Sequence, residues 1–450
     1  MSLNFSKFYT KTNIINLLFF LIPASFIAGN LVLNLNILLL ILTGLSCYKY
    51  DIFKIQLCFL DKLLLIFFSY IFVISCYNNL YSYYFENKNE FIIIIKTLLY
   101  FRYLLLYFVI RYLIIKNVIN FKFFFISCSL CSLFVCLDLV YQYNYGVDIF
   151  GFEASSSRRM SGPFGDELVA GSYLQRFAIF SFFLFPIFFK IKDKKFFYII
   201  FFVLSLLLSF SFIIAGNRMP IILFLLMLTL LFLFEKKTRK LLVFFTIISS
   251  VIFLISINFN TNIKKHFGHF KTKIINLANT FSETNLVTEE QRKNFTEQDD
   301  SAYLITVGDK SYRMTSPHLK DFYSGYTTWH QNKLIGGGVR SFKYNCPKTF
   351  VNCSSHPHNY YLEILSDIGL VGLFILLILF LKIFYDVLRK KYLIKSDLNH
   401  NHIITPFMCI FLAEIFPIKS SGSFFTTNNA TFIFLIIAII VSITRKPNLN

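Results

Sequence analysis

Mostly apolar stretches, each long enough to cross a lipid bilayer, recur along most of this chain. A transmembrane helix needs about 20 such residues. Read by that rule, the sequence predicts about twelve spans, near residues 13–29, 31–47, 63–77, 91–113, 121–143, 173–190, 197–215, 219–234, 241–258, 361–385, 403–418 and 430–444. Only 15% of the 450 residues are charged, against about a quarter in soluble proteins. The sequence therefore predicts an all-α integral membrane protein.

Basic residues mark every second connection between these spans. They are Lys49, Lys54, Lys62, Lys116, Lys122, Lys190, Lys192, Lys194, Lys195, Lys236, Lys237, Arg239, Lys240, Arg389, Lys390, Lys391 and Lys395. Because short cytoplasmic loops carry an excess of Lys and Arg, we expect these loops and both termini in the cytoplasm. The same rule explains the net charge of +20. A nucleic-acid partner is not expected, because the chain has no arginine-rich tail or aromatic-basic motif.

The chain divides into three parts by this reading. Residues 1–258 hold the first nine spans, 259–360 form one large outward loop, and 361–450 hold the last three spans. A loop of this length is more than a connector. Ser316 followed by Pro317 predicts the start of a short helix within it. An apolar stripe at helical spacing indicates an amphipathic helix that lies on the bilayer surface or against the bundle, and packing explains the stripe better than sugar stacking. The stripe consists of Leu319, Phe322, Tyr323, Tyr326 and Trp329.

Two histidines follow at the end of the loop, immediately before a span. His356 and His358 lie in the run 354–363, and Asn359 comes next. A neutral imidazole is well suited to accept a proton near pH 7, and the positive end of a helix favours the neutral form of His358. Asn359 either caps the helix or holds the imidazole tautomer. Ordinary polar loop residues and a zinc site remain alternatives, although no further ligands occur at a recognisable spacing.

Several of these motifs together resemble one family. His358-Asn359 followed by Gly369-x-x-Gly372 resembles the signature of the O-antigen ligase and O-antigen polymerase superfamily. The resemblance extends to residues 161–167 with 171–174, to Ala215-Gly216-Asn217-Arg218, and to the glycines 336–338 with Phe342. It implies a bacterial inner-membrane glycosyltransferase of the polyprenyl-phosphate-sugar type. Such an enzyme uses a polyprenyl-diphosphate-linked glycan as donor, and lipid A–core or another glycan as acceptor.

The resemblance also implies roles for single residues. His358 would deprotonate the acceptor hydroxyl, and Arg218 with Arg313 would hold the departing diphosphate in the bidentate manner of guanidinium groups. Arg340 is the alternative to Arg313 and is otherwise a substrate-binding candidate. The other substrate-binding candidates are His356, Asn359 and Arg159. Neither a metal nor another cofactor is implied.

Two other functions remain open at this point. A polymerase of the same superfamily would share the chemistry and differ only in its acceptor. A transporter or flippase is a different class, and such proteins are often built from inverted repeats with broken helices. The chain shows no such repeat, and a large loop with clustered His and Arg favours an enzyme. The histidine signature favours a ligase.

Charged and thiol side chains suggest further contacts. Lys96 and Arg102 fall inside a predicted span, where charges are costly. They either line a groove for the donor lipid or pair with an acidic residue of another span, Asp138 or Glu414. Cysteines 346 and 353 are the only pair in an outward loop, where disulfides form. We therefore expect a disulfide that closes a short loop just before the histidines.

Overall fold

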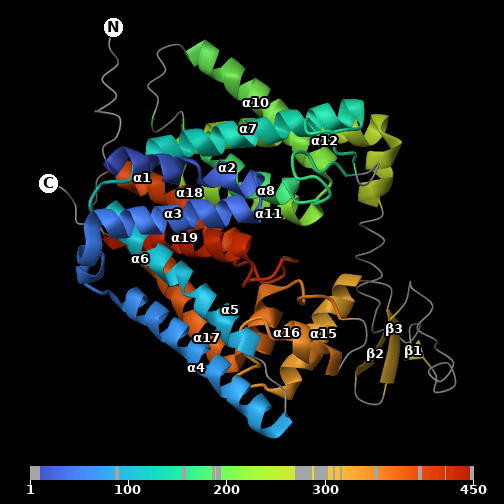
Figure 1. Ribbon diagram of the computed structural model, residues 1–450. Coiled ribbons are helices and arrows are strands. Elements are labelled where there is room, and N and C mark those ends of the chain that lie inside the picture. Colours follow the sequence, from blue (N-terminus) through green and yellow to red (C-terminus); the bar gives the residue numbers. More distant parts are fainter. Residues whose placement is uncertain are drawn as a thin grey trace.

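The computed structural model is a bundle of long helices, with a smaller polar layer at one end (Figure 1). It describes residues 11–86, 91–154, 159–184, 188, 194–268, 286–287, 303–307, 310–314, 317–348, 353–393, 398–420 and 422–445. The elements of the first half are α1 (Lys11–Phe20), α2 (Ile22–Ile27), α3 (Asn30–Tyr48), η2 (Lys49–Lys54), α4 (Phe59–Glu86), α5 (Phe91–Tyr100), α6 (Arg102–Ile115), α7 (Phe121–Tyr145), α8 (Ala170–Phe177), η3 (Ala178–Phe180), α9 (Ser181–Phe183) and α10 (Lys194–Ala215).

The second half continues the bundle and contains the polar layer. Its elements are α11 (Arg218–Phe234), η5 (Lys236–Thr238), α12 (Arg239–Phe259), β1 (Leu286–Val287), β2 (Tyr303–Val307), β3 (Lys310–Met314), α15 (Pro317–Gln331), α16 (Phe342–Asn345), η7 (Cys346–Lys348), α17 (Tyr360–Leu388), η8 (Arg389–Leu393), α18 (Leu398–Glu414) and α19 (Thr427–Arg445).

Within the described residues, eight helices are long and apolar enough to cross a membrane, and two shorter apolar helices, Arg218–Phe234 and His402–Glu414, accompany them. This agrees with the predicted all-α membrane protein; the number of twelve spans stays a prediction. The predicted span 173–190 is an interrupted helix, α8–η3–α9. Almost all of its described residues are buried. Breaks of this kind are tolerated at membrane depth where protein rather than lipid surrounds the backbone.

The C-terminal helix α19 forms the centre of the bundle. It packs on α6, α18, α17 and α3, and all its residues from Asn429 to Ile443 are buried. Phe434 on this helix contacts aromatic rings of two other helices, with ring centroids 5.3 Å from Phe68 and 6.1 Å from Tyr103. A helix that is apolar on every side is expected to lie in such a central position.

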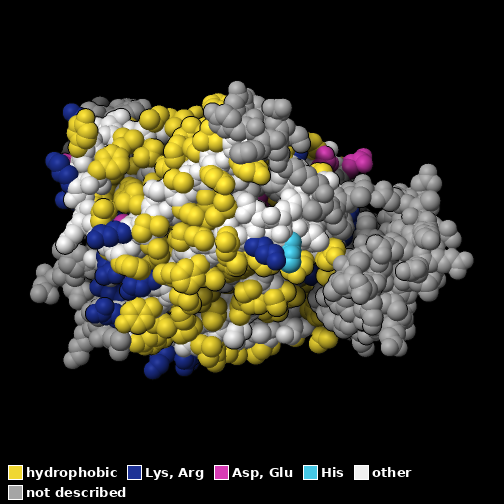
Figure 2. Space-filling view, turned by 90° about the horizontal axis from the view of Figure 1, so that it is seen from below, with side chains coloured by type: hydrophobic (Ala, Val, Ile, Leu, Met, Phe, Trp, Pro, Cys, Tyr) yellow, Lys and Arg dark blue, Asp and Glu magenta, His cyan; other side chains and the backbone are white. Residues whose placement is uncertain are grey.

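The surface of the bundle is divided along its length. Figure 2 shows a broad hydrophobic surface, with most of the visible Lys and Arg side chains gathered toward one end. Helix α15 and the small sheet lie at the opposite end (Figure 1). This separation of charge from apolar surface is the pattern expected for a protein that crosses a bilayer.

The structure describes parts of the predicted loop 259–360. Its short helices are α15, α16 and η7, and α15 begins at Pro317, where the sequence placed a helix start. A three-stranded antiparallel sheet in the order β1-β3-β2 accompanies them, with Ile305 opposite Tyr312. The sequence analysis did not predict this sheet. Its strands are only two to five residues long, too short for a clear alternation of apolar and polar residues.

Candidate functional site

Helix α15 faces the histidine segment with a narrow and mostly polar face. Asp321, Ser324, Gly325 and Thr328 are buried, at the spacing that lines one side of a helix. A Cβ at Gly325 would lie 2.7 Å from Cβ of Pro357, so the helix approaches this segment as closely as glycine permits. The predicted aromatic stripe is not the buried face of α15, because Tyr326 is 45% exposed and the other residues of the stripe are half-buried.

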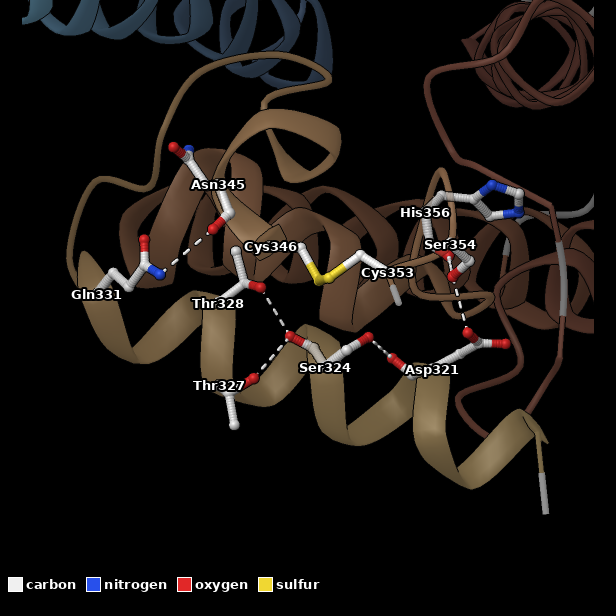
Figure 3. The surroundings of a disulfide bond; sticks show 10 residues. All are labelled: Asp321, Ser324, Thr327, Thr328, Gln331, Asn345, Cys346, Cys353, Ser354 and His356. Carbon is white, nitrogen blue, oxygen red and sulfur yellow. Dashed lines mark hydrogen bonds between the residues drawn. A yellow bond between two sulfur atoms is a disulfide. The ribbon is translucent and has the colours of Figure 1, made fainter. Parts of the chain in front are cut away.

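A disulfide between Cys346 and Cys353 holds the chain just before the histidines (Figure 3). Cys346 is completely buried, and the two Cα atoms lie 6.1 Å apart. The predicted disulfide is thus confirmed. It ties η7 to the start of the segment that carries Ser354 and His356, beside α15.

An aspartate of α15 lies beside the second histidine. Oδ2 of Asp321 is 3.8 Å from Nε2 of His358, while the Ser354 hydroxyl donates a hydrogen bond of 2.7 Å to Oδ1 of the same carboxylate (Figure 3 shows the serine contact). Asp321 is well buried, and the His358 side chain is 35% exposed. His358 also has a φ of +52°, a backbone conformation that is unfavourable for residues other than glycine. Asp321 was not among the residues predicted from the sequence. The signal that could have identified it is its i, i+3, i+4, i+7 spacing with Ser324, Gly325 and Thr328 on one side of α15.

The first histidine has a different environment. The ring of His356 lies 4.2 Å from that of His358. Burial, together with the charges of His358 and Arg340, lowers the pKa of His356 to about 4, although Asp321 acts in the opposite direction. Its Nδ1 is 2.9 Å from the Ser355 hydroxyl, and its buried Nε2 has no hydrogen-bond partner among the described residues. His356 is therefore neutral at pH 7 and has one ring nitrogen left for a ligand.

Asn359 caps the helix that follows. Its side-chain oxygen accepts hydrogen bonds from the backbone N–H groups of Tyr361, at 3.0 Å, and Leu362, at 3.2 Å. Its amide nitrogen donates to the carbonyl of Pro417 at 2.7 Å. Both ends of the side chain are thus used to fix the start of α17 and the loop after α18. Of the two predicted roles, the structure supports the cap.

The two glycine motifs of the sequence contact each other. Helix α17 is broken at Gly369, which has φ 68° and ψ −172°. The turn at residues 333–338 inserts at this break, where the N–H of Gly338 donates to the Asp367 carbonyl at 2.7 Å and the N–H of Leu370 donates to the Lys333 carbonyl at 3.0 Å. A Cβ at Gly369 would overlap the backbone of Leu334. The close approach of two backbones is the reason that glycine is required here.

This junction positions Arg340. The carboxylate of buried Asp367 accepts hydrogen bonds from the backbone N–H groups of Arg340, at 2.7 Å, and Phe342, at 2.8 Å, and from the Ser341 hydroxyl at 3.1 Å. Arg340 has a φ of +59° and an exposed side chain. Its charge acts on His356, so the guanidinium lies on the same side of the molecule as the histidines.

A second basic cluster lies where two other outward loops meet. The Asn217 amide donates to the Leu168 carbonyl at 2.8 Å, and the N–H of Met160 donates to the Ile214 carbonyl at 3.0 Å. Arg218, the first residue of α11, donates to the carbonyl of His266. The charge of Arg159 lies close enough to that of Arg218 for the two to interact. The two side chains thus form one basic region at the N-terminal end of α11.

A buried ionic network lies at the base of the histidine segment. Glu414 accepts hydrogen bonds from Arg176 (2.5 Å) and Tyr360 (2.9 Å), and Lys419 lies 2.8 Å from the same oxygen. Burial lowers the pKa of Lys419 to about 8, although Glu414 favours its charged form. The network joins α8, α17, α18 and the loop before α19, and so fixes the start of α17 relative to the rest of the bundle.

The predicted pairing of Lys96 or Arg102 with Asp138 or Glu414 does not occur in the structure. Lys96 instead donates to the Tyr344 hydroxyl at 3.1 Å, and Arg102 donates to the Tyr103 hydroxyl at 2.7 Å. The Asp138 carboxylate accepts a 2.8 Å hydrogen bond from the backbone of the 144–154 loop. Aromatic hydroxyls and rings, rather than carboxylates, thus accommodate these two cations.

The structure therefore brings His356, His358, Asn359 and Arg340 together, and places Arg159 beside Arg218 in a separate cluster. Arg313 lies on β3, opposite Leu304 of β2, and its side chain lies outside the described residues. In the described part of the chain, no group of three or more His, Cys, Asp or Glu side chains is placed to hold a metal ion.

Comparison with known protein families identifies a relationship for part of the chain. Residues 200–377 match the family model described as O-antigen ligase. This match confirms the resemblance to the O-antigen ligase and polymerase superfamily. The matched residues include Arg218, Arg340 and the whole histidine segment. A search of the curated proteins found no match.

Proposed function

We propose that this protein is a membrane glycosyltransferase of the O-antigen ligase type, which moves a glycan from a polyprenyl-diphosphate carrier to an acceptor hydroxyl. The observation that carries the proposal is the pair of His358 and Asp321, 3.8 Å apart, within a region that matches the O-antigen ligase family. We further propose that this pair lies on the outer face of the inner membrane and both termini in the cytoplasm. The gathering of Lys and Arg at the opposite end of the molecule supports that orientation (Figure 2).

His358 acts as the general base in this proposal. The acceptor oxygen attacks the anomeric carbon of the donor sugar, the bond from that carbon to the diphosphate oxygen breaks, and the proton of the hydroxyl moves to the imidazole. Because Nε2 faces Asp321, Nδ1 is the nitrogen assigned to this proton. The Asp321 carboxylate stabilises the positive charge that the imidazole then carries. His356 is the weaker base, since its pKa is about 4, and its unpartnered Nε2 binds a glycan hydroxyl.

The arginines stabilise the leaving diphosphate. The Arg340 backbone is held by Asp367, and the charge of Arg340 acts on His356; on these grounds we propose Arg340, rather than Arg313, as the guanidinium nearest the reacting centre. Arg218 and Arg159 form the second cluster and bind the phosphates at the mouth of α11. Guanidinium groups bind phosphate oxygens in a planar, bidentate way and lose little conformational freedom for each hydrogen bond formed. Asn359 acts indirectly, by fixing the start of α17.

The test is a transfer assay with the purified full-length protein, a polyprenyl-diphosphate-linked glycan, and a lipid A–core acceptor. His358→Ala should reduce transfer by about 10²–10⁴-fold, the usual cost of losing a general base. His356→Ala is the matched control and should cost much less. Arg340→Lys keeps the charge but loses the planar fork, so it should also impair transfer.

The outcomes separate the alternatives. Near-normal transfer by His358→Ala would show that this segment is not the catalytic centre. Inactive His356→Ala with active His358→Ala would move the base by two residues. Elongation of the lipid-linked glycan without transfer to lipid A–core would identify a polymerase.

A further inference from the structure

A basic cavity lies far from the histidine segment in the sequence and is not used by the proposed reaction. It has a volume of about 750 Å³ and lies between η2, the C-terminal end of α6 and the last residue of α19. Four cationic side chains line it, Lys54, Arg111, Lys116 and Arg445, together with one carboxylate, Asp51. We propose that this basic cavity binds the phosphate headgroup of an anionic phospholipid.

Arg111 makes the cavity a preformed anion site. Its side chain is only 2% exposed, yet it is part of the cavity wall. One end of the guanidinium pairs with buried Asp61, which also accepts a 2.6 Å hydrogen bond from the Tyr107 hydroxyl. Another nitrogen donates weakly to the Gln56 carbonyl at 3.4 Å, and Nε has no hydrogen-bond partner among the described residues. Buried polar groups are normally satisfied, so an incompletely satisfied guanidinium beside a cavity points to an anionic ligand.

The other cations add charge at the rim. Arg445 is anchored by Asp386 at 2.9 Å, and Lys54 lies 3.0 Å from Asp51. The ammonium of Lys116 lies 5.8 Å above the Tyr112 ring, and this lysine is exposed. Three of the four cations are thus paired with a carboxylate, but Asp61 and Asp386 do not line the cavity, so its wall presents four cations and one carboxylate. Basic pockets between transmembrane helices near the cytoplasmic leaflet are typical sites for anionic headgroups.

The apolar edge of the cavity favours a lipid over a free anion. Leu57 and Ile115 line the same cavity, and Leu57 is 41% exposed. Phe53 and Phe59, which lie close to the lining residues in the sequence, are 54% and 53% exposed. A phospholipid satisfies both parts, because its phosphate lies among the cations while its glycerol and acyl chains leave across the apolar edge. Inorganic phosphate would use only the first part.

The experiment is native mass spectrometry of the purified full-length protein with dioleoyl-phosphatidylglycerol, and with dioleoyl-phosphatidylcholine as the neutral comparison. Phosphatidylglycerol should be retained in preference to phosphatidylcholine. Lys116→Gln should weaken its retention about fivefold, the equivalent of about 1 kcal/mol for one lysine near an anionic lipid. Lys54→Gln should have a similar effect. Lys62→Gln is the matched control. Lys62 is exposed and lies in the same predicted loop as Lys54, but it does not line the cavity.

Two results would overturn the proposal. The first is equal retention of phosphatidylglycerol by Lys116→Gln and Lys62→Gln. The second is displacement of the lipid by inorganic phosphate at constant ionic strength, which would identify a site for free anions. Arg111 is left intact in these tests, because its removal would leave Asp61 buried without a counter-ion.

Discussion

Removal of the negative charge beside the proposed base is the sharpest test of the site geometry. Asp321→Asn keeps the size of the side chain and retains an oxygen that accepts the hydrogen bond from Ser354, which is 2.7 Å long in the structure. It removes only the charge that lies 3.8 Å from Nε2 of His358. The protein should therefore fold normally and lose part of its catalytic rate.

The expected size of the effect follows from the distance and the exposure. Two unit charges at 3.8 Å interact with about 1 kcal/mol in bulk water and about 4 kcal/mol at an effective dielectric constant of about 20. Since the His358 side chain is 35% exposed and that of Asp321 12%, solvent screens the pair, and we expect a value of about 1–2 kcal/mol. This corresponds to a decrease in kcat of about 5- to 30-fold.

The assay is the steady-state rate of glycan transfer, with Ser354→Ala as the matched control. Asp321→Asn should lower kcat, because the imidazole that has accepted the proton loses the charge that stabilises it. KM for the lipid-linked donor should change little. Ser354→Ala removes a hydrogen bond to Asp321 but keeps its charge, so its kcat should decrease much less. Wild-type rates in Asp321→Asn, or equal decreases in both variants, would refute the electrostatic role.

Three further predictions concern the scaffold. Alkylation and mass spectrometry should find no free thiol at Cys346 or Cys353. The double serine variant should unfold at a lower temperature, because closing such a loop contributes about 2–4 kcal/mol to stability. An unchanged melting temperature would argue against this stabilisation. Gly369→Ala should lower the amount of folded protein in the membrane, since a Cβ there overlaps Leu334, whereas Gly268→Ala, with open space around it, should not. The thermal stability should fall as the pH drops from 6.5 toward 4, because unfolding lets His356 take up a proton that its folded-state pKa of about 4 excludes. His356→Gln should flatten this dependence, and an equally steep profile would contradict it.

The resemblance, the start of α15 and the cap of α17 could be predicted from the sequence because each depends on neighbouring residues. Ser316-Pro317 marks the start of α15, and Asn359 is placed to cap α17. The disulfide was predicted for the same reason, since Cys346 and Cys353 are close in the sequence. Such signals are set by backbone geometry over one or two turns.

Partners that lie far apart in the sequence could not be predicted in this way. The apolar stripe of α15 suggested one face for packing, yet the small residues Ser324 and Gly325 and the carboxylate of Asp321 form the buried face. Which face of α15 is buried depends on the close approach of Pro357, which leaves no room for a side chain at Gly325. The partners of Lys96 and Arg102 were missed similarly, because a tyrosine hydroxyl and ring can also accommodate a cation.

The sequence by itself determined that this chain forms apolar helices with an alternation of basic loops, since hydrophobicity and charge act on each segment separately. Only the tertiary structure decided that the glycine turn at 336–338 enters the break in α17 at Gly369, and that Arg340 is thereby held beside His356. The physical reason is that these contacts join backbones of distant segments. Their formation depends on shape and on the hydrogen bonds left open by a broken helix, and neither is visible in any one stretch of residues.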